Sequence, residues 1–161
     1  MSVKLDRRQF VGASAAALAA AIMIRPSVAK AAAFPVTHSD ADWRRILDPK
    51  RYAVLRQAAT EAPFSSPLLS EHRRGTFVCA GCRNALFSSA TKFESGTGWP
   101  SFWRPLPNAD RLRPDKSLGM ERTEVLCARC GGHLGHLFDD GPRPTGQRYC
   151  MNGLAMEFRP A

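Results

Sequence analysis

Long apolar runs are nearly absent from this chain, and their absence limits its relation to membranes. The longest run, Val11 to Ile24, has about 14 residues and is rich in alanine, whereas a helix that crosses a bilayer needs about 20. Low-complexity tracts and internal repeats are also absent, apart from two short cysteine motifs described below. A chain of 161 residues with this composition is long enough for one domain with one core.

Acidic residues are few relative to basic ones, and the formal net charge is +9. Beyond residue 31 the excess is smaller, because 18 Lys and Arg residues stand against 13 Asp and Glu, a net charge of +5. A charge of this size aids solubility but does not by itself indicate an anionic partner. Basic and aromatic residues are not interleaved as in a base-stacking platform, so we expect no nucleic-acid partner.

Residues 1–31 have the features of an export signal. The stretch Asp6-Arg7-Arg8-Gln9-Phe10-Val11 is a twin-arginine pattern, and the apolar run follows it. The segment resembles a bacterial twin-arginine signal with cleavage after Ala29 or Ala31, and an uncleaved anchor is the alternative. There is no lipid-attachment cysteine, because the first cysteine is Cys79. We therefore expect a periplasmic protein without stable membrane association after cleavage, with residues 32–39 as a linker.

The rest of the chain changes from a helical to a β-rich pattern near Gly75. Ser39 and Asp48 are suitable helix N-caps and predict short helices over 40–47 and 49–59. From Gly75 onward, short β-rich runs alternate with glycine- and proline-rich turns. We predict a mainly β fold of two packed antiparallel sheets, β-tent or zinc-ribbon-like, with short N-terminal helices. The predicted core-facing helix residues are Trp43, Ile46, Tyr52 and Leu55, and the strand candidates are 76–79, 85–87, 92–94, 123–127, 134–138, 149–152 and 155–158.

Four of the five cysteines form two Cys-x-x-Cys pairs, Cys79/Cys82 and Cys127/Cys130, with 44 residues between them. Each pair follows a β-rich run and opens a tight turn, so two such turns can build a tetrahedral four-thiolate site. Four protein ligands close the coordination sphere, and we therefore predict one structural zinc ion per chain that clamps two β halves together. Iron and a pair of disulfides are the alternatives.

The fifth cysteine, Cys150, has no partner among the motifs. Period-2 alternation places Arg148, Cys150 and Asn152 on one face of a strand. A positive charge beside a cysteine lowers the pKa of the thiol and favours the thiolate, which is the nucleophile. An isolated cysteine on a strand is otherwise a buried structural residue. The neighbouring motifs decide between these two interpretations.

Two further motifs precede Cys150, namely Gly98-Trp99-Pro100-Ser101-Phe102 and His133-Leu134-Gly135-His136. With the two cysteine pairs and Arg148-Tyr149-Cys150-Met151-Asn152, they stand in the order found in B-type methionine-R-sulfoxide reductases. The chain resembles that family over about residues 40–158. The resemblance implies a reductase domain over residues 40–161, a peptide-methionine (R)-S-oxide reductase that acts on oxidised methionine in proteins. It leaves open whether the free amino acid is also a substrate.

The chemistry of sulfoxide reduction gives the polar residues their expected roles. A thiolate, here Cys150, attacks the sulfoxide sulfur while an acid protonates the oxygen, which leaves methionine and a cysteine sulfenic acid. His133 and His136 are both candidates for the acid. We expect Arg148 to lower the pKa of Cys150 and Asn152 to hold the thiolate or the attacking geometry through a hydrogen bond.

The expected substrate contacts are aromatic. Trp99 and Phe138 offer a wall for the methyl group, and a rigid indole can discriminate between the two epimers by shape. Only the family resemblance assigns the R epimer. Asp139-Asp140 indicates a turn at the end of a strand, with orientation of His136 as the alternative role.

One departure from the family pattern changes the expected redox cycle. Many relatives carry a second, resolving cysteine at the position where this chain has Thr97. Because the other four cysteines are assigned to metal, an outside thiol must reduce the sulfenic acid on Cys150. We therefore predict a monomeric one-cysteine type, regenerated by a thioredoxin-like protein or a small thiol. The alternative function is a non-enzymatic zinc β-domain that binds a peptide or small molecule.

Overall fold

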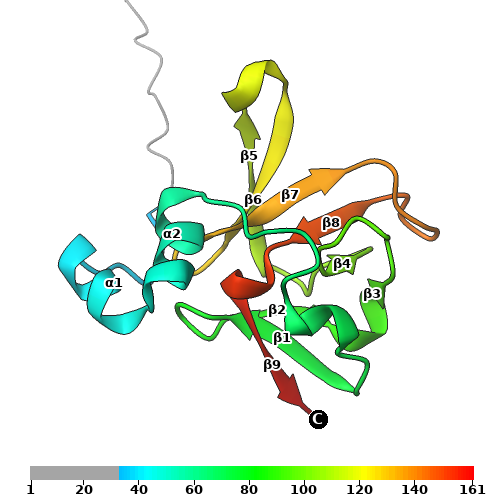
Figure 1. Ribbon diagram of the computed structural model, residues 1–161, viewed down its shortest axis with the longest axis horizontal. Coiled ribbons are helices and arrows are strands. Elements are labelled where there is room, and N and C mark those ends of the chain that lie inside the picture. The colour runs from blue at the N-terminus through cyan, green and yellow to red at the C-terminus, as the bar shows by residue number, and fades with distance from the viewer. Residues whose placement is uncertain (1–32) are drawn as a thin grey trace, which may run out of the picture. The chain divides into compact units, whose positions relative to one another are not determined.

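The computed structural model describes residues 33–161, so the predicted export signal and the first linker residue lie outside the described residues. The described chain begins with two α-helices and continues with nine strands and four short 3-10 helices (Figure 1). The elements are α1 (Asp40–Ile46), α2 (Pro49–Gln57), η1 (Pro67–Ser70), β1 (Gly75–Cys79), β2 (Ala85–Ser88), η2 (Ser89–Thr91), β3 (Lys92–Phe93), β4 (Ser101–Phe102), β5 (Asp110–Asp115), η3 (Ser117–Gly119), β6 (Arg122–Cys127), β7 (His133–Phe138), β8 (Arg148–Met151), η4 (Gly153–Ala155) and β9 (Met156–Pro160).

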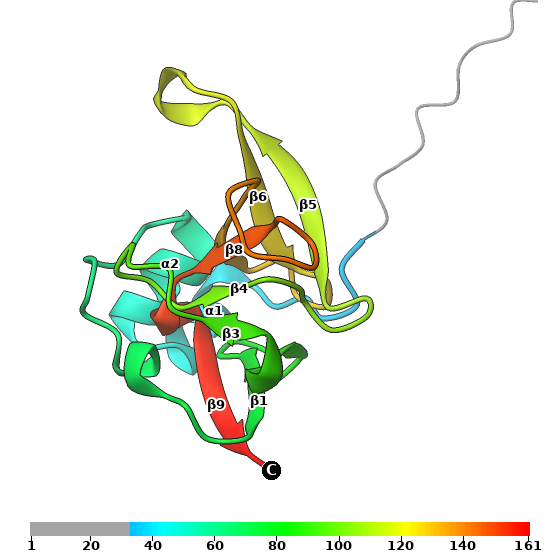
Figure 2. The same cartoon turned by 90° about the vertical axis from the view of Figure 1, so that its right-hand side faces the viewer.

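The strands form two antiparallel sheets. The smaller sheet has the order β2-β1-β9, and the larger has the order β3-β4-β8-β7-β6-β5. Strands β5 and β6 make a long hairpin that extends beyond the neighbouring strands (Figures 1 and 2). The mainly β fold with two antiparallel sheets and short N-terminal helices is thus confirmed.

The core lies between the two sheets and is aromatic at its centre. Phe102 of β4 lies 4.9 Å from the ring of Phe77 in β1 and 4.3 Å from the ring of Phe87 in β2, centroid to centroid. All three side chains are fully buried. Such pairs contribute about 0.5–1.5 kcal/mol each beyond the area that they bury. The rings therefore fix the separation of the sheets on the side away from the polar face of β8.

The two helices are capped as predicted. The Ser39 side chain accepts a hydrogen bond at the start of α1, and the Asp48 side chain accepts two at the start of α2. Trp43, Tyr52 and Leu55 are buried, but the prediction for Ile46 is wrong, because its side chain is 51% exposed. The helix ends at Ile46. The next residue, Leu47, has an extended backbone, and the Leu47 side chain is buried in the core in place of Ile46.

Two strands were missed by the sequence patterns, β4 and β5. β4 has only two residues, too few for any periodicity. β5 contains Pro114 and four charged residues, and it was not among the predicted strands. It lies at the edge of the larger sheet, where a proline costs no ladder hydrogen bond.

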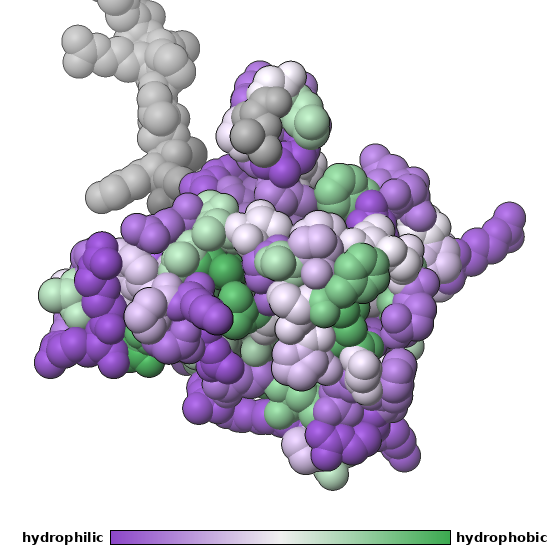
Figure 3. All heavy atoms as spheres, viewed as in Figure 1, coloured by the Kyte–Doolittle hydropathy of each residue, from purple (hydrophilic) through white to green (hydrophobic). Residues whose placement is uncertain are grey.

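The surface of the described region is largely polar. Figure 3 shows a face on which polar residues predominate and apolar residues form small patches. No described helix has the length and apolar character needed to cross a membrane. Residues 33–39 contain no helix or strand, and the amide of Val36 donates a hydrogen bond of 2.8 Å to the carbonyl of Arg129. The chain entering the domain is therefore attached to the turn that carries Cys127 and Cys130.

Candidate active site and metal centre

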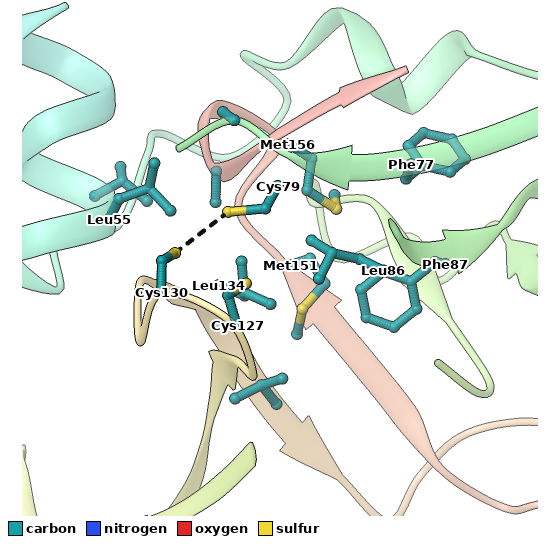
Figure 4. Close-up of a cluster of buried hydrophobic side chains, with 14 of the residues drawn as sticks. Leu55, Phe77, Cys79, Leu86, Phe87, Cys127, Cys130, Leu134, Met151 and Met156 are labelled. Atoms are coloured by element: carbon teal, nitrogen blue, oxygen red, sulfur yellow. Dashed lines mark hydrogen bonds between the residues drawn. The ribbon is translucent and has the colours of Figure 1, made fainter. Parts of the chain in front are cut away.

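The first cysteine turn (Cys79–Cys82) and the second cysteine turn (Cys127–Cys130) meet at the junction of the two sheets. All four Sγ atoms lie within 4.8 Å of one another. Cys79 Sγ is 3.7 Å from Cys130 Sγ (Figure 4), and Cys82 Sγ is 3.5 Å from Cys127 Sγ. Four sulfurs around a metal at about 2.3 Å are about 3.8 Å apart, whereas disulfide sulfurs are about 2.05 Å apart. The spacing fits a four-thiolate metal site and does not fit two disulfides.

The two turns have matching backbone geometry. The amide of Arg83 donates to the carbonyl of Cys79, and the amide of Gly131 donates to the carbonyl of Cys127, both at 2.9 Å. Arg83 and Gly131 occupy the same position in each turn and both have left-handed φ values, 63° and 68°. Cys79 ends β1 of the smaller sheet and Cys127 ends β6 of the larger. A bound metal would therefore cross-link the sheets at one point.

The predicted nucleophile lies on one rung of the larger sheet. Ser101 of β4 pairs with Cys150 of β8, Cys150 pairs with His136 of β7, and His136 pairs with Glu124 of β6. Residues directly opposite in antiparallel strands share a face, with Cβ atoms about 4.5–5.5 Å apart. A hydroxyl, a thiol, an imidazole and a carboxylate are therefore successive neighbours. We call Ser101, Cys150, His136 and Glu124 the catalytic rung.

A β-bulge brings His133 to the same face as His136. Two residues three positions apart on a regular strand face opposite sides of the sheet. Here the pairing of β6 with β7 shifts, so that Val125 is opposite Gly135 while Leu126 is opposite His133. The extra residue in β7 shifts the alternation of side chains by one position, so His133 faces the same side of the sheet as His136. The centroids of the two imidazole rings are 5.4 Å apart.

His133 is the buried member of the pair, with 3% of its surface exposed. Its Nδ1 lies 2.7 Å from the Glu124 carboxylate, whose second oxygen accepts a 2.8 Å hydrogen bond from Arg113. Burial lowers the pKa of His133, and the Glu124 carboxylate only partly offsets this effect. The ring is therefore neutral, with its proton on Nδ1, and Nε2 presents a lone pair.

His136 is held by a carboxylate from the β5–β6 hairpin. Its Nε2 lies 2.8 Å from Asp115, and Asp115 also accepts a 2.7 Å hydrogen bond from Arg122. Hydrogen bonds from Ser117, and then from His136, hold the pKa of Asp115 well below its usual range. Asp115 is therefore an ionised acceptor, and the Nε2 of His136 carries a proton. Neither Asp115 nor Glu124 was predicted as a site residue, because β5, which carries Asp115, was not predicted as a strand and the strand candidate 123–127, which contains Glu124, was given no chemical role.

The environment of Cys150 corrects one expectation. The thiol is half-buried, and burial raises its pKa above the ordinary value. The Thr97 hydroxyl at 3.8 Å, the charge of Arg148 and the Ser101 hydroxyl each act to lower it. Arg148 thus acts in the expected direction, but burial outweighs it, so the resting thiol is not a preformed thiolate at neutral pH.

Arg148 is itself committed to other groups. It forms two hydrogen bonds of 2.8 Å with the Asp140 carboxylate, and its guanidinium lies 4.3 Å from the centroid of the Phe138 ring. The alternative role of Asp140, orientation of His136, is therefore wrong, because Asp115 has that contact. Asp139 is exposed at the turn.

Asn152 does not bond to the thiol. Its side chain accepts a 3.0 Å hydrogen bond from the amide of Glu61 and donates one of 3.2 Å to the carbonyl of Leu134. The carbonyl of Glu61 in turn accepts a 3.1 Å bond from Nε1 of Trp99. The backbone of Glu61 therefore fixes both Trp99 and Asn152. The sequence patterns did not indicate this role of the Glu61 backbone. The Glu61 carboxylate separately accepts hydrogen bonds from the amides of Gly153 and Leu154.

A cavity of about 140 Å³ brings five of the predicted site residues together. Its size suits a small group rather than a complete drug-sized ligand. Larger hollows of about 490 and 570 Å³, beside α2 and beside Trp103, contain neither a cysteine nor a histidine. A hollow of about 340 Å³ contains both histidines but not Cys150. Arg148 and His133 flank the cavity without lining it. The lining residues are Thr60, Trp99, Arg122, Gly135, His136, Phe138, Cys150 and Asn152.

Comparison with known proteins gives consistent matches over the described region. The model of the SelR domain matches residues 47–160. A protein of Bradyrhizobium diazoefficiens named peptide methionine sulfoxide reductase MsrB is 58% identical over 127 residues, 78% of this chain and 91% of its own length. Proteins with the same name from Leptospira interrogans and Leifsonia xyli are 52% and 54% identical, over 78% and 79% of this chain and 97% and 93% of their own lengths.

Proposed function

Because this chain belongs to the SelR-domain family of peptide methionine sulfoxide reductases, we propose that it reduces methionine R-sulfoxide in proteins to methionine. The observation that carries the proposal is the position of Cys150, opposite His136 on the catalytic rung and in one cavity with Trp99. A non-enzymatic β-domain would have no need of a thiol and an imidazole facing the same small cavity.

Cys150 supplies the two electrons of the reduction. Its thiolate attacks the sulfoxide sulfur, the oxygen is protonated and passes to the cysteine as a sulfenic acid, and the thioether is released. His136 is the acid that the geometry favours, because it lines the cavity and is paired with Cys150. Since Asp115 holds the Nε2 proton, His136 donates through its other nitrogen and must carry two protons to do so. His133, behind it and neutral, accepts rather than donates at Nε2.

The cavity has an aromatic side that suits the methyl group of the sulfoxide and a polar side that suits its oxygen. Trp99 is fixed by its bond to the Glu61 carbonyl, and Phe138 by the guanidinium over its ring. These rings suit the methyl group, whereas His136 and Arg122 suit the oxygen. The opposite epimer would place the oxygen against an aromatic face, where it has no hydrogen-bond donor.

We assign one zinc ion to the four-cysteine site. Zinc prefers a tetrahedral thiolate set, and four protein ligands leave no open position for substrate. The ion would supply a cross-link between the sheets, and Asn84 Nδ2, 3.6 Å from Cys127 Sγ, would donate to a ligand sulfur. Elemental analysis distinguishes zinc from iron, the rival metal for four thiolates.

The redox cycle proposed here is of the one-cysteine type. Thr97 stands 3.8 Å from Cys150 Sγ, and the other four cysteines lie in the cluster, so no described thiol is free to form a disulfide with Cys150. A thioredoxin-like protein or a small thiol would then reduce the sulfenic acid. We further propose that residues 1–31 direct export to the periplasm and that the mature protein is a monomer.

The decisive experiment offers each epimer of a methionine sulfoxide derivative to the metal-loaded protein, with dithiothreitol as reductant. Only the R epimer should turn over, and Cys150→Ser should abolish turnover while metal content and melting temperature stay unchanged. Without reductant, one equivalent of methionine should form, dimedone should trap the sulfenic acid, and no internal disulfide should appear. Activity that survives Cys150→Ser, or equal turnover of both epimers, contradicts the proposal.

A further inference from the structure

Three hydroxyl groups form a chain that ends at the sulfur of Cys150. Ser95 Oγ lies 2.7 Å from Ser101 Oγ and 2.9 Å from Thr97 Oγ1, and Thr97 Oγ1 lies 3.8 Å from Cys150 Sγ. At its other end, Ser101 Oγ lies 3.1 Å from the carbonyl of Trp99. Ser101 is 1% exposed and belongs to the catalytic rung, so this end of the chain is fixed in the core.

The chain has two hydrogen-bond arrangements, because each hydroxyl has one proton and can donate in either direction. In the first, the Cys150 thiol donates to Thr97, and the donors continue through Ser95 and Ser101 to the Trp99 carbonyl. In the second, Ser101 donates to Ser95, Ser95 donates to Thr97 and Thr97 donates to the Cys150 sulfur, so the Trp99 carbonyl no longer receives the Ser101 proton. The amide of Thr97, 3.4 Å from Ser95 Oγ, is compatible with both. The first arrangement suits a thiol and the second suits a thiolate.

We propose that the Thr97–Ser95–Ser101 chain is a reversible hydrogen-bond relay that stabilises the Cys150 thiolate, with Thr97 as the residue that contacts the reacting sulfur. The relay rests on the proposed function only in that thiolate attack is its use. Hydrogen bonds to a charged acceptor are shorter and roughly twice as strong as neutral ones. The contact at 3.8 Å, long in the resting thiol, therefore gains most when the sulfur becomes charged.

The need for such a donor follows from the surroundings of the thiol. Burial opposes the charged form of Cys150, and the guanidinium of Arg148 is engaged twice by Asp140. His136, the imidazole opposite on the rung, is held through Nε2 by Asp115. Arg122, which lines the cavity with Cys150, is paired with Asp115, and Glu124 of the rung is paired with Arg113. A hydroxyl that can reverse its donor direction supplies stabilisation without a permanent charge.

The test measures the thiol directly and needs no sulfoxide. The rate of alkylation of Cys150 by iodoacetamide is followed against pH in the metal-loaded protein, with the modified residue identified by mass spectrometry. Thr97→Val, which keeps the shape and removes the hydroxyl, should raise the apparent pKa of Cys150 by about one unit. Alkylation near pH 7 should fall by about tenfold, because the thiolate is the reacting form.

Three variants serve as controls and as a second path to the answer. Thr97→Ser keeps the hydroxyl and should titrate as the unaltered protein does. Thr145→Val removes an exposed hydroxyl bonded to the Trp103 carbonyl and should change nothing. Ser95→Ala breaks the chain one step away from sulfur and should raise the pKa of Cys150 by a smaller amount than Thr97→Val.

The relay is wrong if Thr97→Val titrates like the unaltered protein, or if Thr97→Ser shifts as far as Thr97→Val. Should Thr97→Val fail to fold, an unchanged titration in Ser95→Ala overturns the relay on its own. Because alkylation requires no substrate, these results stand whether or not reductase activity is found. A failure of the proposed function and a failure of the relay are therefore distinguishable.

Discussion

The five cysteines of this chain occupy two contrasting environments. Around the cluster each sulfur has three other sulfurs as neighbours, and three of the four residues are buried. Around Cys150 the neighbours are hydroxyls, an imidazole and a committed guanidinium, and the residue is half-exposed. Thiolates that converge bind metal, whereas a single thiol beside proton donors and acceptors can react with substrate. The contrast shows that neighbours, and not residue type, decide what a cysteine does.

The two environments are nevertheless linked through one short segment. The second cysteine turn ends at Cys130, and β7 begins three residues later at His133. His136, on the same strand, is the partner of Cys150 on the catalytic rung. Loss of the cluster should therefore disturb the rung, whereas loss of the Cys150 thiol should leave the cluster intact.

The largest expected effect is the loss of a metal ligand. Cys127→Ser should give insoluble or unfolded protein, because structural zinc sites carry an apparent binding free energy on the order of 10 kcal/mol, comparable with the whole stability of a domain. Cys150→Ser, the matched control, should melt close to the unaltered protein. Solubility, circular dichroism and zinc content measure the difference. A folded, metal-free Cys127→Ser protein would show that the cluster is not needed for folding and would contradict this prediction.

The second prediction concerns a substitution in the catalytic rung that leaves the cysteine cluster unchanged. His136→Gln retains a donor that can reach Asp115, so unfolding free energy should change by no more than about 0.5 kcal/mol. The proton donor for the sulfoxide oxygen is lost, and kcat/KM should fall by roughly 10²- to 10⁴-fold. His133→Asn keeps the donor to Glu124 and should reduce kcat/KM far less. The opposite order of the two activities would assign the acid to His133 and contradict the geometry.

The sequence predicted those parts of both environments that local patterns encode. The spacing of the cysteines predicted the two Cys-x-x-Cys turns. The alternation of residues along β8 correctly placed Cys150 and Met151 on opposite faces of the strand, and Met151 is fully buried. The joint orientation of His133 and His136 depends on a bulge, which follows from pairing between β6 and β7 and leaves no mark in the residue pattern.

Contacts between distant segments were equally inaccessible. Asp115 contacts His136 from β5, a strand that the sequence patterns did not predict. Glu61 holds Trp99 and Asn152 through its backbone, and its carboxylate accepts hydrogen bonds from the amides of Gly153 and Leu154. These contacts join segments that are far apart in the sequence, so no local pattern indicates them. The net effect of burial on Cys150 also required the fold, because a sequence shows the charge of Arg148 but not the desolvation that outweighs it.

The smallest expected effect concerns pH and the histidine nearest the cluster. Burial lowers the folded-state pKa of His133 below its unfolded value of about 6.5. Between those two values the unfolded chain binds more protons than the folded one, so the free energy of unfolding falls as pH drops through this window and is constant above it. The slope from one group is at most about 1.4 kcal/mol per pH unit. Urea unfolding between pH 7 and 5.5, in zinc-buffered solution, should reveal this slope, and His133→Asn should lack it.

Exposed His72 provides the control, since His72→Asn should retain the slope. Protonation of the cluster thiolates would destabilise all three proteins alike, so parallel slopes in the unaltered protein and His133→Asn would assign the whole acid sensitivity to the metal site.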